Sequence, residues 1–341
     1  CGVAQICLDK FSIKEIDFKK MDNVIRKNIP HGYDVYPRSR EKTLINLFKL
    51  DLNELNYKNK KDLDRAFKSA GSLGGGNHYL EVNKDSSGGL YLTVHTGSRN
   101  IGNQIAKFYQ NKAIKYCQKE NSYKKIELIE HLKENEAEKN IQRELDEIKK
   151  EFYIDKELCY LTDELMEQYL NDMEIAQRFA ETNRILILSD IIYNYIDRSK
   201  KFQEIVEEVT QSRIECIHNY IDLESRILRK GAISANLGED VLIPINMRDG
   251  IIIGKGKGNS DWNNSAPHGA GRILSRSQAK DKISMQEYKD SMEEVYSTCV
   301  NASTLDESPQ AYKPLDEIVE NIKDTVEIKE ILKPIYNFKS N

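Results

Sequence analysis

The most constraining feature of this chain is a run of 128 residues, from Asn103 to Lys230, that contains no glycine and no proline. These two residues are the usual helix breakers, so their absence permits long helices. Within the run, the stretch from Ile126 to Phe152 spaces apolar residues three and four apart among mixed charges, which is the pattern of an amphipathic helix. The stretches Glu151 to Tyr169 and Asp172 to Tyr220 are similar. We therefore expect residues 103–230 to form a predominantly helical insertion, with helices that pair as arms and lie mainly outside the core.

The regions on either side of this run have a different composition. Sixteen of the 18 glycines fall between Gly71 and Gly102 or between Gly231 and Gly271. Short β-branched or apolar runs punctuated by glycine, proline and aspartate occur at Leu90 to Ser98 (LYLTVHTGS) and Val241 to Gly256 (VLIPINMRDGIIIGKG). Such runs are typical of strands and turns. The sequence thus predicts an α/β fold, a mixed core built from roughly the first hundred and the last hundred residues.

Charge and cysteine usage limit the function classes. The 51 basic and 55 acidic residues give a formal net charge of −4, so any RNA contact needs a local basic patch. No segment approaches the ~18 apolar residues of a membrane span. The six cysteines are scattered without a CxxC pair, which favours reduced thiols and a cytoplasmic protein. Because the chain begins with Cys1 and not with Met, we expect an upstream segment to be missing.

A glycine-rich string, GSLGGGNHYLEV from Gly71 to Val82, is the first candidate for chemistry. Glycine lets backbone amides approach phosphate oxygens closely. The string lacks the Lys-Ser/Thr ending of a Walker A loop. It carries Asn77, His78 and Glu81, and the spacing of His78 and Glu81 would suit one face of a helix. Taken alone, the string is also compatible with an ordinary turn before a strand or helix.

Two further histidines stand in contrasting contexts. His95 ends an apolar, strand-like run and precedes Arg99, a side chain that can bind a phosphate through two nitrogens. His218, in ECIHNYIDLE, is expected on or near the end of a helix. Taken alone, it is interpreted as a partly buried helical histidine. The remaining histidines outside the glycine-rich strings, His31 and His131, are expected on the surface without a chemical role.

His268 lies in SAPHGAGRILSR, between Pro267 and Gly269. These neighbours predict a tight, exposed turn. A neutral imidazole there could attack phosphorus while Arg272 neutralises the developing charge. The alternative is a plain helix N-terminus. The lysines of the glycine-rich segment 254–258 are a weak second phosphate signal, and we expect that segment to be a flexible basic loop or hairpin.

The chain contains, in this order, the strings GGGNHYLE, HTGSRNIG, IHN, RKGA, SAPHGAGRILSR, AYK and KPIYNFK. The same order is found in the RtcB family of RNA ligases, which the chain resembles from Cys1 to Lys339. The opening CGVA resembles the family's DxGCG element from the cysteine of that element onward. The resemblance implies one RtcB-like catalytic domain over residues 1–341, a mixed α/β core with the helical insertion inside it. It also implies an enzyme that joins RNA 2′,3′-cyclic phosphate or 3′-phosphate ends to 5′-hydroxyl ends with GTP and Mn²⁺, in RNA repair or tRNA splicing.

The resemblance also assigns roles to individual residues. His268 would be the histidine that becomes linked to GMP. Two manganese ions are implied, one held by Cys1, His95 and His218 and the other by Cys1, as a bridging ligand, and His78. Contacts to the guanine nucleotide are implied for Asn77, Glu81, Arg272, Tyr312 and Lys339. Asn246 stands where many members have a nucleotide-contacting serine, and the family's aspartate, three residues before the cysteine, lies outside this chain.

Two other functions fit part of the same pattern. Two metal ions beside Asn-His-x-x-Glu suit hydrolysis as well as ligation, so a metal-dependent phosphohydrolase is the first alternative. A catalytically reduced protein that binds RNA ends is the second. The expected ligands are GTP, two Mn²⁺ ions and RNA ends, with no membrane partner.

Overall fold

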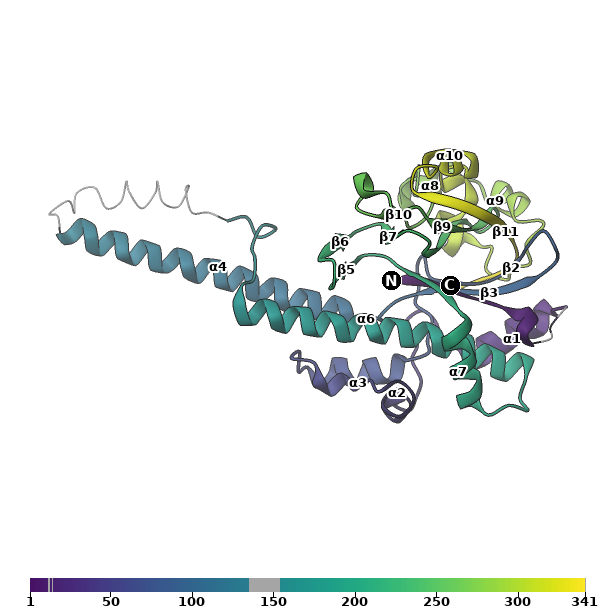
Figure 1. Cartoon of the computed structure of the whole chain (residues 1–341), viewed down its shortest axis with the longest axis horizontal. Helices are drawn as coiled ribbons and strands as arrows, with labels where there is room; N and C mark the ends of the chain where they lie inside the picture. Colours follow the sequence, from purple (N-terminus) through teal and green to yellow (C-terminus); the bar gives the residue numbers. More distant parts are fainter. Residues whose placement is uncertain (12, 14, 135–153, 341) are drawn as a thin grey trace.

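The computed structural model of the chain describes residues 1–11, 13, 15–134 and 154–340, and its centre is a seven-stranded sheet (Figure 1). The strand order is β4-β1-β3-β2-β11-β9-β8, and every neighbouring pair is antiparallel. Two small sheets pair β5 with β6 and β7 with β10. The strands are β1 (Gly2–Cys7), β2 (Tyr79–Lys84), β3 (Leu90–Thr96), β4 (Ile214–Ile217), β5 (Tyr220–Asp222), β6 (Ile227–Arg229), β7 (Ala232–Ser234), β8 (Asp240–Asn246), β9 (Gly250–Gly256), β10 (Ser265–Pro267) and β11 (Val326–Lys339). The expected mixed α/β fold is confirmed.

The helices lie on both sides of this sheet. The α-helices are α1 (Phe18–Asn28), α2 (Glu41–Phe48), α3 (Lys60–Ser69), α4 (Ile101–Glu134), α6 (Asp163–Ile191), α7 (Phe202–Ser212), α8 (Arg276–Lys282), α9 (Met285–Ser291) and α10 (Leu315–Asn321). Short 3₁₀ turns are η1 (Leu8–Phe11), η2 (Leu52–Glu54), η5 (Ser260–Trp262), η6 (Ala302–Glu307) and η7 (Pro309–Ala311), and η4 (Ile192–Ile196) is a π-helical turn. Many begin with the expected side-chain caps: Asp17 accepts a hydrogen bond from the backbone of Lys20 at the start of α1.

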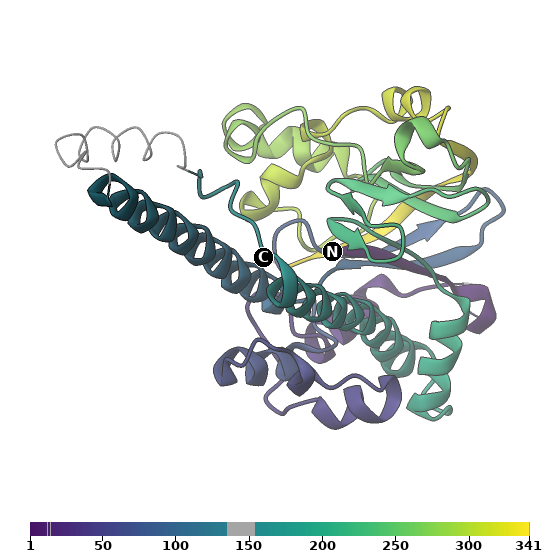
Figure 2. The same ribbon diagram turned by 60° about the vertical axis from the view of Figure 1, so that its left-hand side comes forward.

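One face of the sheet is apolar and is covered by α1, α6 and α7 (Figures 1 and 2). Leu80, Leu92 and Val94 on the strands pack with Ile187 and Leu188 of α6 in one buried cluster. A second apolar cluster joins α2 and α3 to the neighbouring parts of α4 and α6. Strand alternation explains the first cluster, because every second side chain of β2 and β3 points to the helices.

The glycine- and proline-free run is mainly helical, as expected, and α4 and α6 lie side by side as a projecting pair (Figures 1 and 2). Residues 135–153, part of the expected helical stretch, lie outside the described residues. Two expectations were wrong. The C-terminal half of α6 lies in the core, where Ile187 and Leu188 are fully buried, because its apolar side chains meet the sheet. The run also ends in strands, since β4 pairs with β1 at the sheet edge.

The C-terminal tail occupies the middle of the sheet. β11 pairs with β2 on one side and β9 on the other, so residues near the end of the sequence connect its two halves. The segment 254–258, expected as a flexible basic loop or hairpin, begins as the last part of β9, whose residues pair with β8 and β11. Helices α8, α9 and α10 cover the other side of the molecule (Figure 1). Among the described residues, no helix is long and apolar enough to cross a membrane.

Candidate active site

Along β2, β3 and the end of β11 the second face of the sheet is polar, although it is also buried. β2 alternates Tyr79, Glu81 and Asn83 with the apolar residues of the helix-covered face. Glu81 is 2% exposed and Asn83 is fully buried, so this face does not meet solvent. The partner strands add polar side chains to the same face; these are Thr93 and His95 of β3 and Asn337 and Lys339 of β11.

His78 and Glu81 do not share a face of a helix, and the alternative of a turn before a strand is confirmed. His78 lies in the glycine-rich loop before β2, and Glu81 lies within the strand. The alternation in YLEVNK, apolar and polar by turns, is the local signal that identifies a strand here. Gly74 explains part of the loop's glycine content, because a Cβ at this position would lie 1.9 Å from Nδ1 of His78. The loop therefore packs its backbone directly against the histidine ring.

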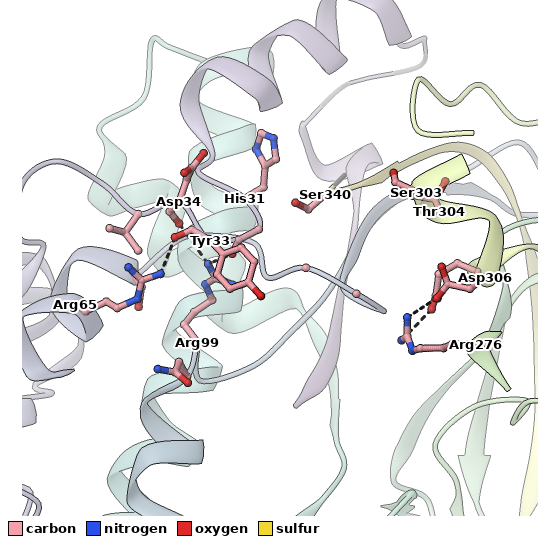
Figure 3. Close-up of a pocket in the computed structure, with 17 residues that line it drawn as sticks. His31, Tyr33, Asp34, Arg65, Arg99, Arg276, Ser303, Thr304, Asp306 and Ser340 are labelled. Atoms are coloured by element: carbon pink, nitrogen blue, oxygen red, sulfur yellow. Dashed lines mark hydrogen bonds and ion pairs between the residues drawn. The ribbon is translucent and has the colours of Figure 1, made fainter. Parts of the chain in front are cut away.

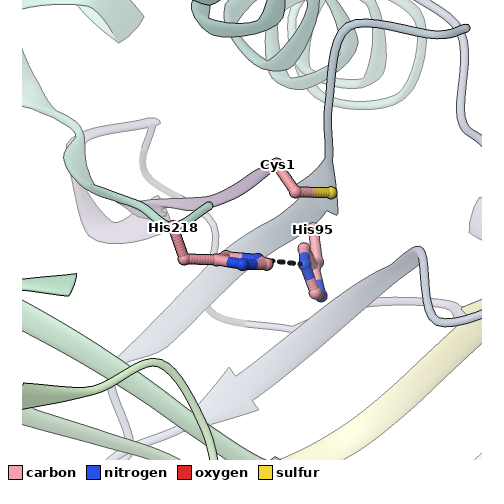
Figure 4. Close-up of side chains that lie close together, drawn as sticks. All are labelled: Cys1, His95 and His218. Carbon is pink, nitrogen blue, oxygen red and sulfur yellow. Dashed lines mark hydrogen bonds between the residues drawn. The ribbon is translucent and has the colours of Figure 1, made fainter. Parts of the chain in front are cut away.

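His218 follows β4 and does not lie on a helix, which corrects the expectation from sequence. Its backbone N–H donates to the carbonyl oxygen of Cys1 at 2.8 Å, which extends the pairing of β4 with β1. His95 lies next to the end of the neighbouring strand β3, as expected. The adjacent ends of β4, β1 and β3 thus bring Cys1, His95 and His218 together from distant parts of the sequence (Figure 4).

These three side chains form a group with the composition of a metal site. One ligand atom from each, the Sγ of Cys1 and a ring nitrogen of His95 and of His218, lies within 4.8 Å of the others. The Nε2 atoms of the two histidines are 3.1 Å apart. His78 adjoins the group, with its Nε2 3.1 Å from the Sγ of Cys1. Within the described residues this is the one group of at least three such ligands.

Burial keeps these imidazoles neutral. It lowers the pKa of His218 to about 3, with a further contribution from the charge of His268. Burial and the charge of Arg99 lower the pKa of His78 to about 3, and burial lowers that of His95 well below its ordinary value. The Nδ1 atoms of His78 and His218 are buried without a hydrogen-bond partner. Neutral imidazoles beside a thiol suit a divalent transition metal, so the residues fit the implied ion.

His268 lies directly after β10, half-buried, with its ring centre 4.5 Å from that of His218. Its Nδ1 lies 2.7 Å from the carbonyl oxygen of Gly231. A carbonyl only accepts hydrogen bonds, so Nδ1 carries the proton and the Nε2 lone pair is free. The pairing of β10 with β7, which ends at Ala232, brings Gly231 to this position. The local structure therefore sets the tautomer that a nucleophilic histidine needs.

A cavity of about 430 Å³ adjoins His268 and is within the usual size range of small-molecule sites. Its wall comes from the polar face of the sheet and from the segment after β10. Its lining includes His95, His268, Asn246 and four of the residues implied to contact the nucleotide: Asn77, Glu81, Arg272 and Tyr312. Lys339 does not line the cavity itself, but its ammonium group lies 3.1 Å from the carboxylate of Glu307, which does.

Glu307 is the main residue that sequence reasoning missed. Its carboxylate accepts hydrogen bonds from Tyr312 at 2.8 Å and Lys339 at 3.1 Å, and it pairs with Arg272 at 3.3 Å and Arg276 at 3.0 Å. Burial opposes its ionisation, but the charge of Lys339 and these hydrogen bonds lower its pKa below the ordinary value. The sequence offered one signal for it. Glu307 lies in an acidic pair beside a Ser-Pro turn, five residues before Tyr312.

Asn246 lines the cavity, but its amide is committed to the β8–β9 turn. Its Oδ1 accepts hydrogen bonds from the backbone of Arg248 and Asp249, both at 2.9 Å. Its Nδ2 donates to the Asp249 carboxylate at 2.7 Å. The side chain at the position of the family's serine therefore stabilises a hairpin in this chain.

A second and larger cavity, of about 1090 Å³, adjoins the first, because Arg276 and Glu307 line both (Figure 3). It contains the guanidinium groups of Arg65 and Arg99 and the ring of Tyr33, which is 93% exposed. His31, expected to be a plain surface residue, is half-buried in its wall because its ring packs edge-on against Phe338. The lining carries three arginines and three carboxylates, Asp34, Asp306 and Glu307.

Comparisons with known proteins find similar sequences over most of the chain. A family model described as tRNA-splicing ligase RtcB matches residues 3–340. The RNA-splicing ligase RtcB of Escherichia coli K12 is 29% identical over 277 residues, which cover 79% of this chain and 60% of that protein. The tRNA-splicing ligase RtcB of Aeropyrum pernix is 26% identical over 353 residues, covering 91% and 66%. The chain thus spans about 60% of the length of the relatives it matches.

Proposed function

This chain belongs to the RtcB family, and we propose that it is an RNA ligase that joins a 2′,3′-cyclic phosphate or 3′-phosphate end to a 5′-hydroxyl end with GTP. The observation that carries the proposal is the environment of His268. Its ring lines a nucleotide-sized cavity and lies 4.5 Å, centre to centre, from His218 of the group of metal-ligand side chains. A group-transfer enzyme needs this combination of nucleophile, nucleotide site and cation site.

In the first step, Nε2 of His268 attacks the α-phosphorus of GTP. A P–N bond forms, the bond to the bridging oxygen breaks, and pyrophosphate leaves. The Nδ1–H bond to Gly231 stabilises the imidazole as it becomes positively charged. Arg272 and Arg276, both at the cavity wall, are suited to balance the charge of the phosphates.

In the second step, an oxygen of the RNA 3′-phosphate attacks the phosphorus held by His268. The P–N bond breaks, and GMP becomes attached to the RNA end. The 5′-hydroxyl of the other strand then attacks the RNA 3′-phosphorus, loses its proton and expels GMP. A 2′,3′-cyclic phosphate must first be opened by water. His268 returns to its starting state, so it acts as a true catalyst.

We assign the metal ligands on the same basis. Cys1, His95 and His218 would hold one ion, manganese by the family resemblance, and Cys1 and His78 would contribute to a second. Bound cations would neutralise the phosphates that meet at this point. The neutral imidazoles described above are in the protonation state that binding requires.

We assign the nucleotide contacts to Asn77, Glu81, Arg272, Tyr312 and Lys339. The large cavity that contains Arg65 and Arg99 would receive the RNA ends. Its shared wall with the nucleotide cavity supports this assignment, because the RNA phosphate must reach His268 from a neighbouring position.

The test is transfer of label from α-labelled GTP to the protein in the presence of Mn²⁺. The wild-type chain should form an acid-labile adduct, and His268→Ala should form none. His31→Ala is the matched control, since it changes a half-buried histidine in the other cavity. Release of phosphate without any adduct in the wild type would favour the phosphohydrolase, and binding of RNA ends without adduct would favour an RNA-end-binding protein.

A further inference from the structure

A basic groove runs along the exposed side of α1. It has a volume of about 510 Å³, and its lining includes Lys19, Lys20, Lys27 and Arg198. Asp17 is the one carboxylate among the residues that line it. The groove therefore has a local charge of opposite sign to that of the whole chain, whose formal net charge is −4.

These positive charges are not neutralised by ion pairs within the described residues. Across the described parts of the chain, none of the four cations forms an ion pair with a carboxylate. The ammonium group of Lys20 lies 5.8 Å from the ring of Tyr195, and Arg198 donates to Asn194. Asp17 accepts a hydrogen bond from the backbone of Lys20 and so serves as the cap of α1. Uncompensated cations in a concave surface attract an extended anion.

The groove and the large cavity are close to each other along the chain. Asn28, the last residue of α1, lines the groove, and His31, three residues later, lines the large cavity. The hydroxyl of Tyr36 donates to the carbonyl oxygen of Asn28 at 3.0 Å and so fixes this connection. With 11 residues, α1 has a length of about 16 Å. The groove and the large cavity therefore lie at the two ends of a short connection, from Asn28 to His31.

We propose that this basic groove binds the phosphodiester backbone of the RNA strand, beyond the nucleotides that enter the large cavity. The inference rests on the proposed function, because it takes RNA as the partner. Lysine ammonium groups are point charges on flexible stems, suited to phosphates in any sequence and not to base edges. The groove thus adds affinity for longer RNA without adding sequence specificity.

The test compares two sets of lysines. K19Q/K20Q/K27Q removes the charges of the groove, and K282Q/K289Q/K333Q removes three exposed lysines elsewhere as the matched control. Glutamine has a helix propensity close to that of lysine, so α1 should remain folded. Binding of 3′-phosphorylated RNAs of about 4 and about 20 nucleotides is measured by fluorescence anisotropy over a range of salt concentrations.

We expect the groove variant to bind the longer RNA about 10- to 100-fold more weakly at low salt, with the slope of log affinity against log salt reduced by about 2. Its affinity for the short RNA should equal that of the wild type, and the control variant should match the wild type with both. Unchanged binding of the longer RNA, or equal losses with both RNAs, would overturn the inference. Equal losses in the groove and control variants would also overturn it.

A parallel assay of GMP transfer separates this inference from the proposed function. If the wild type forms no adduct but the groove variant loses affinity for long RNA only, the groove assignment stands and the ligase proposal fails. If adduct formation and joining occur and the variant binds long RNA normally, the groove assignment alone fails. If the groove variant loses binding to anionic vesicles but still binds RNA normally, the groove binds a membrane surface. That result would likewise overturn the RNA assignment.

Discussion

The two faces of strands β2 and β3 are both buried, but they are built from opposite kinds of side chain. The face toward α1, α6 and α7 carries Leu80, Leu92 and Val94, which pack with other apolar residues. The face toward the candidate active site carries Glu81 and Thr93, in the same strands and at alternating positions. Burial of the first set stabilises the fold directly, whereas burial of the second carries a desolvation cost. Along these strands, residues that stabilise the fold therefore alternate with residues that face the candidate active site.

Hydrogen bonds across the strands offset much of that cost. Gln5 donates to Thr93 at 2.8 Å, and Thr93 donates to Asn83 at 2.8 Å. Asn83 and Asn337 donate to the two carboxylate oxygens of Glu81 at 2.6 and 2.7 Å. The network connects four strands and holds Glu81 in one orientation at the cavity wall. The polar face is thus kept rigid by pairs of side chains and not by packing alone.

The largest effect should come from the polar side of the sheet. His95→Ala and His218→Ala each remove one of three clustered ligands and should lower adduct formation and RNA joining by about 10³-fold or more. The folded structure should persist, as judged by circular dichroism. Metal analysis should show less bound Mn²⁺ than in the wild type, and undiminished occupancy in both variants would rule out this ligand set.

A substitution on the apolar face should instead lower stability and leave activity nearly unchanged. Leu92 is fully buried between the strands and the helices, so Leu92→Ala should lower the free energy of unfolding by about 2–5 kcal/mol. Urea denaturation measures this loss. Activity per folded molecule should stay near that of the wild type. If activity falls as far as it does in His95→Ala, the two faces are not functionally separate.

A smaller effect should appear in the pH dependence of stability. Burial raises the pKa of Glu81 to about 7, against the opposing hydrogen bonds from Asn83 and Asn337 and the charge of Lys339. The folded state therefore binds a proton that the unfolded state releases, and stability should fall as the pH rises from about 4.5 to about 7. Glu81→Gln should remove roughly 1–3 kcal/mol of this dependence. Unfolding measured across that range checks it, and parallel curves for the two proteins would contradict it.

The smallest effect should come from Asn246. Because its amide supports the turn between β8 and β9, Asn246→Ser should lower the free energy of unfolding by about 0.5–1.5 kcal/mol. Adduct formation should change little, since the amide is occupied by the turn. Thermal unfolding and the labelling assay measure the two quantities. A large loss of labelling with unchanged stability would show that Asn246 contacts the nucleotide directly.

Much of the fold was predictable where the signal is local. The run without glycine and proline predicted the helices, and the β-branched runs predicted β3, β8 and β9. The family motifs identified residues that the structure brings around one cavity and one group of histidines. Glu307 was missed because its importance comes from four partners that are distant in sequence or unremarkable alone.

The sequence by itself determined the kinds of element and the identity of the reactive side chains, because backbone preferences and the spacing of apolar residues act over a few positions. Only the tertiary structure decided that the segment before His218 is a strand, that β11 lies between β2 and β9, and that half of α6 is core. Those outcomes depend on which distant segments supply hydrogen-bond partners and apolar surface. A short apolar run such as Ile214–Ile217 fits a helix or a strand equally well until β1 is beside it.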